Sequence, residues 1–227
     1  MGGPWRRPRL AALDALVAAG MPAHDLSHDM NHVRRVASWC ARLAPELGVD
    51  VERAAAAGLC HDLVQTAKEG PARATGGVQS ALRADALLAA AGFEADERAA
   101  ITGAIATCSW SAGKPPEDAL GAVLQDADRL DAIGAIGIAR NMACAAHIHQ
   151  RTGNGALFHP SDPRGQDRPL DDRRFAADHA PLKLLRLAAT MHTAGARDEA
   201  AKRHARLAAY YEDLSEEAEL GAIPDGA

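Results

Sequence analysis

The sequence predicts an all-α fold, a helical bundle, for most of its 227 residues. Three observations lead to this prediction: alanine-rich segments repeat at the helical period, β-branched residues rarely alternate with polar ones, and acidic residues recur where helices would begin. Hydrophobic residues make up 48% of the chain and aromatic residues only 4%, so Ala, Leu, Val and Ile must form the core. A chain of this length can bury such a core as one domain. We expect a single domain over residues 1–220 and a disordered tail over residues 221–227.

Eight helices are expected along the chain. They span residues 8–19, 29–44, 50–63, 78–91, 95–109, 116–143, 179–194 and 196–219. The first has an apolar stripe formed by Leu10, Leu13 and Val17. The third is almost wholly apolar or small, which indicates a buried helix. Capping residues and helix breakers mark the clearest boundaries. These are Val49-Asp50, Pro115-Pro116 and Gly195.

One long irregular stretch, residues 151–174, is rich in Gly, Pro, Asp and Arg. A loop of this length in a compact domain is either a lid or disordered. His159, Arg164 and Arg168 would allow it to close over a phosphate, but the sequence also fits a surface loop.

Composition indicates a cytoplasmic protein that binds neither membranes nor nucleic-acid polymers. Three arginines precede Leu10, as in a signal peptide, but Asp14 interrupts the apolar run, so no export signal or membrane span is expected. The net charge of −5 lacks the basic surface that nucleic-acid polymers require. The cysteines show no paired spacing and are expected to be reduced core residues. They are Cys40, Cys60, Cys108 and Cys144.

Polar residues that could bind a metal occur at unexpected places in apolar helices. His32 shares a helix stripe with Val36, Trp39 and Cys40, and the pair His61-Asp62 ends an apolar helix. A carboxylate in such surroundings must find a counter-charge or a metal. A lone histidine on an apolar face is more often a hydrogen-bonded core residue than a ligand, and an adjacent His-Asp pair is a weak signal by itself.

The third part of the pattern is an acidic run, Gln125-Asp126-Ala127-Asp128-Arg129-Leu130-Asp131, on an otherwise apolar helix. So much negative charge has no structural need there, which favours a functional site. Asp126 and Asp128 point in different directions on a helix, so only one of them should ligate a metal. The residues alone leave the choice between the two open.

Three motifs together resemble the HD phosphohydrolase superfamily, and in particular a branch of small uncharacterised bacterial HD hydrolases. They are Ser27-His28-Asp29-Met30-Asn31-His32-Val33-Arg34-Arg35-Val36, His61-Asp62-Leu63, and the string from Gln125 to Arg140. The resemblance covers nearly the whole chain and implies an HD-domain helical bundle. It also implies a metal site of His32, His61, Asp62 and Asp128, with Asp126 as the fallback for the last ligand.

Imidazole and carboxylate ligands suit several divalent metals. The resemblance favours one Mn²⁺ ion, with Fe, Co, Ni, Zn or Mg as alternatives. Dinuclear members, including di-iron oxygenases, have extra histidines between the His-Asp pair and the final Asp, and this chain has none there. Cys108 stands where the branch usually has His, so metal or substrate contacts from that helix are in doubt.

A metal ion in such a site would polarise a phosphoryl oxygen and activate a water molecule. Asp131 and Asp29 are candidates for accepting the water's proton, although both could instead be capping or supporting residues. Candidate phosphate-binding cations have equally ordinary alternatives, as ion-pair or loop charges. They are Arg35, Lys68, Arg129 and Arg140.

The leading hypothesis is therefore a metal-dependent phosphohydrolase whose partner is a small phosphorylated substrate. Similarity to the branch favours a nucleoside triphosphate, with release of the monophosphate and pyrophosphate. The alternatives are a nucleoside monophosphate phosphatase and, from another class, a non-catalytic metal-stabilised nucleotide sensor. No further cofactor is expected, and a homodimer is compatible with the sequence.

Overall fold

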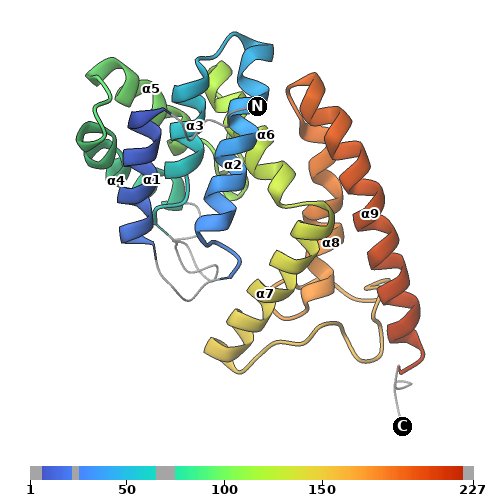
Figure 1. The fold of residues 1–227 in the computed structure, drawn as a ribbon. Helices are drawn as coiled ribbons and strands as arrows, with labels where there is room; N and C mark the ends of the chain where they lie inside the picture. Colours follow the sequence, from blue (N-terminus) through green and yellow to red (C-terminus); the bar gives the residue numbers. More distant parts are fainter. Residues whose placement is uncertain (1–6, 22–25, 65–74, 222–227) are drawn as a thin grey trace. The chain divides into compact units, whose positions relative to one another are not determined.

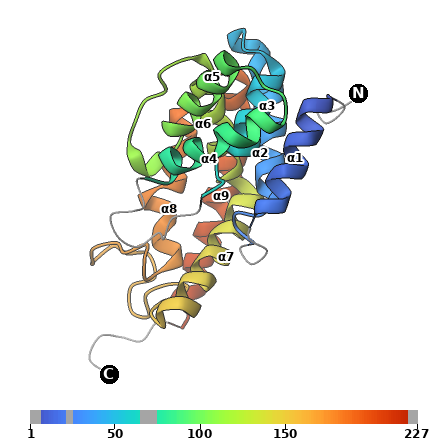
Figure 2. The ribbon, with the colours of Figure 1, turned by 90° about the vertical axis from the view of Figure 1, so that its left-hand side faces the viewer.

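The structure, a computed structural model, describes residues 7–21, 26–64 and 75–221. The prediction of an all-α fold is confirmed: the described residues form α-helices with short 3-10 segments, and β structure among them is limited to one bridge between Ala156 and Phe175. The helices (Figures 1 and 2) are α1 (Pro8–Gly20), α2 (Met30–Leu43), α3 (Val51–Cys60), α4 (Gly76–Ala90), α5 (Ala95–Ala106), α6 (Ala119–Asp131), α7 (Gly134–Thr152), α8 (His179–Leu182) and α9 (Ala194–Glu219).

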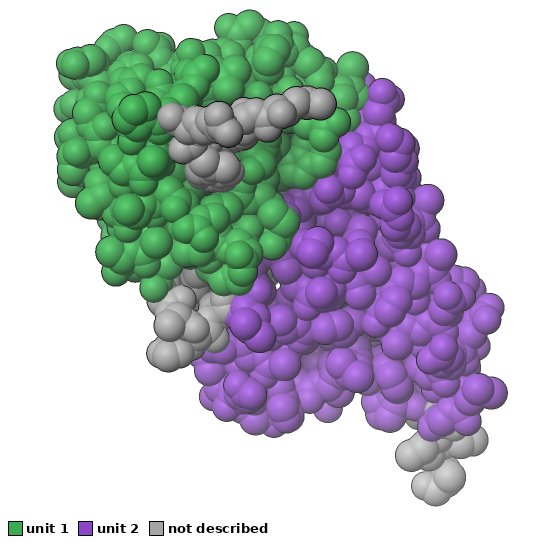
Figure 3. All heavy atoms as spheres, viewed as in Figure 1, with its two compact units in different colours: residues 1–24, 28–129, 191–196 green, residues 25–27, 130–190, 197–227 purple. Residues whose placement is uncertain are grey.

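The chain divides into two compact units, coloured separately in Figure 3. Unit 1 comprises residues 1–24, 28–129 and 191–196, and unit 2 comprises residues 25–27, 130–190 and 197–227. The single domain expected over residues 1–220 stays a prediction. The expected tail lies, apart from Gly221, outside the described residues.

In unit 1, helix α3 is the central element and contacts α1, α2, α4 and α5. Its residues from Ala54 to Cys60 are all buried, as the apolar run predicts. Asp50 caps the helix by accepting hydrogen bonds from the backbone nitrogens of Glu52 and Arg53, both at 2.9 Å. The predicted stripe of Leu10, Leu13 and Val17 on α1 is also buried.

Helices α2 and α3 approach each other at Gly58. A Cβ atom added to Gly58 would lie 2.6 Å from the Cα of Ala37 and 2.7 Å from its nitrogen. Backbone atoms cannot move aside as a flexible side chain can, so only glycine permits this spacing. The contact therefore sets how closely the two helices pack.

An ion-pair network ties α1 to α3 and α5 within unit 1. Arg9 donates to the carboxylates of Glu97 at 2.8 Å and Glu52 at 2.7 Å. Glu97 also accepts from the backbone nitrogen of Glu94, closing a capping box at the start of α5. The hydrogen bond from Arg9, followed by that from Glu94, lowers the pKa of Glu97 to about 2.

Unit 2 is organised around α7, the 3-10 segments and the later part of α9. Asn141 of α7 donates to the carbonyl of Ala176 at 2.9 Å and to the hydroxyl of Tyr211 at 2.7 Å. The buried Asp178 accepts from Arg168 through both of its oxygens, at 2.6 and 2.7 Å. These contacts join α7 to Ala176 and to Tyr211 of α9, and they pair Arg168 of the predicted loop with Asp178.

The helix predicted over residues 116–143 is in fact two helices, α6 and α7. The break falls at Ile133, whose backbone is extended, and Gly134, which has a φ of +75°. Glycine adopts this conformation at little cost, and the side chain of Arg203 lies directly over the position where a Cβ would be. The sequence predicted one helix because the helical spacing of apolar residues continues on both sides of the break.

The prediction of one α-helix over residues 179–194 was also wrong. Only His179–Leu182 is α-helical, and Leu184–Thr190 is a 3-10 segment. Leu184 and Leu187 are both buried, a spacing of three residues that a 3-10 helix places on one side. The boundary expected at Gly195 lies inside the first turn of α9 instead.

Among the described helices, we find none that combines the length and the apolar character needed to cross a membrane.

Gly58→Ala should weaken both stability and metal binding, because the added methyl group pushes α2 away from α3. We expect a loss of about 1 to 3 kcal/mol in the free energy of unfolding, measured by denaturant titration. Gly103→Ala is the matched control: Gly103 lies in α5 with nothing within 4 Å of the added Cβ. It should gain about 0.5 to 1 kcal/mol. Equal effects at the two positions would contradict the packing argument.

Glu97→Gln should lower the free energy of unfolding by about 1 to 3 kcal/mol at pH 7. The folded pKa of Glu97, about 2, lies below the value of 4.5 for an unperturbed glutamate. Its contribution is therefore complete above pH 4.5 and is lost as the pH falls toward 2. The gap between wild type and variant should close over this range, whereas exposed Glu117→Gln should show no gap at any pH.

Candidate metal centre

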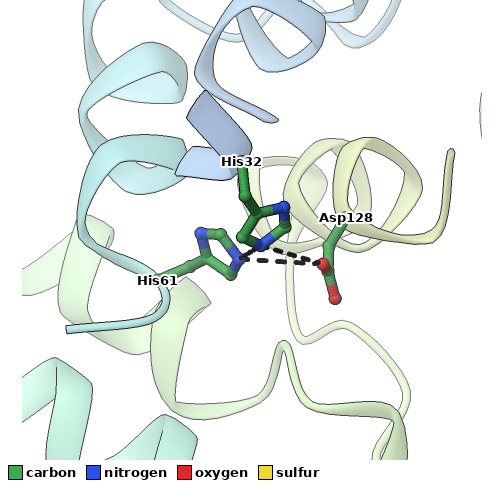
Figure 4. A group of neighbouring side chains, drawn as sticks. All are labelled: His32, His61 and Asp128. Atoms are coloured by element: carbon green, nitrogen blue, oxygen red, sulfur yellow. Dashed lines mark hydrogen bonds and ion pairs between the residues drawn. The ribbon is translucent and has the colours of Figure 1, made fainter. Parts of the chain in front are cut away.

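Three side chains from separate segments of unit 1 converge in a small cluster (Figure 4). His32 comes from α2, His61 follows the end of α3, and Asp128 comes from α6. The Nε2 atoms of His32 and His61 lie 3.2 Å apart. Oδ1 of Asp128 lies 3.9 Å from Nε2 of His32 and 3.7 Å from Nε2 of His61. Atoms of all three groups thus lie within 4.8 Å of one another.

Local structure orients both imidazoles. Asp29 caps α2 and accepts from the backbone nitrogen of His32 at 2.9 Å, which fixes the first turn that carries this side chain. His61 is the residue just after α3, and its Nδ1 lies 2.8 Å from the carbonyl oxygen of Gly58. Because the carbonyl can only accept, Nδ1 carries the proton and Nε2 is left to ligate.

The spacing fits a single divalent ion. Two ligands at about 2.1 Å from one ion, at angles of about 90 to 109°, stand about 3.0 to 3.4 Å apart. The two imidazole nitrogens meet this condition, and Asp128 reaches it with a small side-chain movement. Two nitrogens and a carboxylate suit Mn, Fe, Co, Ni or Zn, so the donor set does not select one metal.

The electrostatics of the cluster favour a cation. Burial opposes protonation of His61, yet the hydrogen bond and charge of Asp128, the charge of Asp62 and the Gly58 carbonyl outweigh it and raise its pKa to about 9. Burial raises the pKa of the Asp62 carboxyl, but the charges of His28, His61 and His32 outweigh it and lower this pKa overall. Both shifts show a site that stabilises positive charge beside its carboxylates.

Asp62 lies next to the cluster of three and outside it. Its Oδ2 is 3.9 Å from Nε2 of His32, and its side chain is 24% exposed. The fourth ligand expected from the sequence is therefore adjacent to the other three, and its coordination stays a prediction.

Asp126 and Asp128 have separate partners. Asp126 is fully buried, and its two oxygens accept from the backbone nitrogens of His192 and Thr193 and from the hydroxyl of Thr193, each at 2.8 Å. Asp128 instead faces His32 and His61. Asp126 thus holds the segment before α9, while Asp128 is positioned for a metal.

The two proposed proton acceptors have structural contacts. In addition to capping α2, Asp29 accepts from the side-chain nitrogen of Asn31 at 3.0 Å. Asp131, in unit 2, is buried and accepts from Arg140 at 3.1 Å. Arg140 also donates to the carbonyl of Ser27 at 2.7 Å.

The other candidate phosphate-binding cations differ in their surroundings. Arg35 lies on α2 and lines a surface hollow. Arg129 is buried, and burial lowers its pKa while the charges of Asp126 and Asp128 oppose the shift. Lys68 lies outside the described residues.

Sequence reasoning missed the contacts that hold Arg129. Its guanidinium donates to the side-chain oxygen of Gln125 and lies 3.2 Å from Nε2 of His192, with the ring of Trp110 at 5.4 Å. The spacing of Gln125 and Arg129 at i and i+4 was the available signal. His192 is 63 residues from Arg129, and no local pattern predicts that contact.

Cys108, where the resembling branch has His, is buried beside the centre. Burial raises the pKa of its thiol, and the negative charge of Asp128 raises it further. Burial also raises the pKa of Cys60 to about 12. Neutral thiols at these positions agree with the expected reduced core residues, and all four cysteines are free of disulfides. Cys144 was wrongly expected in the core, since it is only partly buried.

Comparison with known proteins gives a consistent result. The HD domain family matches residues 29–133. The uncharacterised protein YpgQ of Bacillus subtilis is 32% identical over 179 residues, which is 78% of each chain. Its crystal structure in complex with ADP covers 92% of this chain and 97% of that one, with a TM-score of 0.66 and 26% identity.

Two further solved structures agree over nearly the whole chain. A protein of Lactobacillus plantarum has a TM-score of 0.73 and 30% identity, and covers 93% of this chain and 97% of its own. An HD-superfamily hydrolase of Bacillus thuringiensis has a TM-score of 0.62 and 27% identity, with 92% and 96% covered.

Separate substitutions of Asp126 and Asp128 should distinguish an effect on metal binding from an effect on folding. Asp128→Asn should reduce metal affinity at least tenfold, because an anionic ligand becomes neutral, while the chelator-treated variant stays folded. Asp126→Asn should cost about 2 to 3 kcal/mol, because its amide group meets backbone donors. Elemental analysis, calorimetric metal titration and thermal unfolding measure these effects. Metal loss confined to Asp126→Asn would reverse the assignment.

Proposed function

This chain belongs to the HD superfamily of metal-dependent hydrolases, and from that premise we propose that it hydrolyses a nucleotide or another small phosphate ester. In this proposal a nucleoside triphosphate is cleaved to the monophosphate and pyrophosphate by a metal-activated water. The native ion is Mn²⁺, bound as one ion per chain, and the protein acts in the cytoplasm.

The convergence of His32, His61 and Asp128 carries the proposal. Two neutral imidazoles and the carboxylates of Asp128 and Asp62 would balance the formal charge of a divalent ion, and the ion would still be a Lewis acid. Such an ion would polarise a phosphoryl oxygen and lower the pKa of a bound water. The side chain of Asp128 is 30% exposed, so a substrate can approach the centre from that side.

The chain's own residues would hold the metal ion and bind the phosphate groups of the substrate. His32, His61, Asp62 and Asp128 hold the ion, and the hydrogen bond from Nδ1 of His61 to Gly58 keeps its imidazole in the ligating tautomer. The proposed cations would bind the phosphate chain and offset its negative charge. They are Arg35, Lys68, Arg129 and Arg140.

Asp29 and Asp131 are the proposed proton acceptors for the attacking water. Each already accepts hydrogen bonds inside the fold, so a purely supporting role is the alternative. The two roles differ in their kinetic signature: loss of a proton acceptor lowers kcat with a changed pH profile, whereas loss of a support lowers stability and metal content together.

A nucleotide substrate is supported by the relatives. The similar protein YpgQ has a structure in complex with ADP, and that structure covers 92% of this chain. A metal centre made of imidazole and carboxylate groups next to cationic side chains suits the polyphosphate of such a ligand.

Purified protein with added Mn²⁺ should release pyrophosphate from nucleoside triphosphates, as measured by separate assays for pyrophosphate and orthophosphate. A matched panel of mono-, di- and triphosphates assigns the bond that is cut. Asp128→Asn should lower kcat/KM at least 100-fold, which is about 2.7 kcal/mol of transition-state stabilisation. Asp96→Asn, an exposed aspartate of α5, is the control and should retain full activity.

Other products would replace the proposal. Orthophosphate from monophosphates would identify a monophosphatase. Metal binding and nucleotide binding without turnover of any member of the panel would identify a sensor.

A further inference from the structure

A shallow hollow of about 470 Å³, widely open to solvent, lies on the exposed side of α2, within unit 1. Its lining combines a tryptophan, two arginines, an amide and a hydroxyl, and this volume falls in the range of small-ligand sites. The lining residues are Asn31, Arg34, Arg35, Ser38 and Trp39.

The hollow and the candidate ligand His32 share helix α2. Arg35 and Trp39 follow His32 at i+3 and i+7, so the three side chains project from nearly the same side of α2. Seven residues of helix extend about 10 Å, so the tryptophan stands two turns from the candidate ligand. The arginine lies between the tryptophan and His32 along the helix.

Trp39 occupies an unusual position for a residue on this stripe. Its neighbours on the predicted apolar stripe, Val36 and Cys40, are completely buried, whereas the indole of Trp39 is half-buried and lines the hollow. The guanidinium of Arg42 lies 5.2 Å from the ring centroid. This guanidinium lies over one face of the indole, so a planar ligand would stack on the other face or replace the guanidinium.

The polar lining residues favour a ligand with anionic and hydroxyl groups. Arg34 donates to Asp14 through two nitrogens, at 2.8 and 2.7 Å, so this arginine forms a fixed wall of the hollow. Ser38 donates to the carbonyl of Arg34 at 2.8 Å and Asn31 donates to Asp29 at 3.0 Å. Each of these two side chains still offers an oxygen that can accept a hydrogen bond from a sugar hydroxyl.

We propose that this hollow binds the nucleoside part of the substrate, with the base stacked on the indole of Trp39. Arg35 then meets the phosphate chain between the base and the metal cluster. The inference rests on the proposed function and adds the residue that would recognise the base of the nucleotide, a group that a base-free polyphosphate lacks. Stacking accepts any base, because every base has an aromatic face, so the hollow gives little discrimination among bases.

A binding experiment without turnover tests this inference. The Mn²⁺-loaded protein is titrated calorimetrically with α,β-methylene ATP, whose bridging carbon resists the proposed cleavage, and separately with inorganic tripolyphosphate. Trp39→Leu removes the stacking surface, and Trp39→Phe keeps an aromatic ring as the matched control. Metal content and thermal unfolding of each variant verify that the protein is folded and loaded.

Trp39→Leu should raise the Kd for the nucleotide analogue about tenfold, the factor that corresponds to roughly 1.4 kcal/mol of lost stacking. Its Kd for tripolyphosphate should stay within about twofold of wild type, since this probe has no base. Trp39→Phe should fall between wild type and Trp39→Leu. The nucleotide analogue should also quench tryptophan fluorescence in wild type more than in Trp39→Phe.

The possible results are distinguishable. An unchanged Kd for the analogue in Trp39→Leu, or an equal loss for both probes, overturns the inference even if wild type hydrolyses nucleotides. Selective loss for the analogue supports the inference even if no hydrolysis is detected, and the proposed function then fails alone. Absence of analogue binding to wild type overturns the inference directly.

Discussion

The close contact between α2 and α3 at Gly58 is the constraint on which the site depends. The backbone of Ala37 fills the space of a side chain at Gly58, and the two histidines lie a short distance along the chain from this contact. The carbonyl of the same glycine holds Nδ1 of His61. One residue thus sets the separation of the helices and the orientation of an imidazole, so that packing and metal chemistry are inseparable here.

Helix α6 shows how one short segment serves both stability and function. Asp126 accepts hydrogen bonds from three donors in the segment before α9, and those hydrogen bonds compensate for its burial. Asp128, two residues later, points to the imidazoles and stays partly exposed. Because charges gathered at Asp128 and Asp62 are best offset by a cation, the folded state and the metal-bound state should stabilise each other.

Different faces of helix α2 likewise have different roles. His32 faces the cluster, Val36 and Cys40 enter the core, and Trp39 remains at the surface with Arg35. A nucleotide placed along this helix would reach from an aromatic surface to the metal in two helical turns. The arrangement connects the proposed chemistry to the recognition of its substrate through a single rigid element.

The sequence by itself determined the helical fold and the helices from Pro8 to Ala106, because apolar period and caps act over short distances. It also drew attention to His32, to the pair His61-Asp62 and to the acidic run with Asp126 and Asp128, since polar groups in apolar helices stand out, and the resemblance favoured Asp128. The tertiary structure showed that Asp126 and Asp128 have different partners, because the partner of Asp126, Thr193, is 67 residues away. It likewise placed the helix break at Gly134, the 3-10 form of residues 184–190 and the surface position of Trp39, since these depend on contacts between distant segments that no local pattern records.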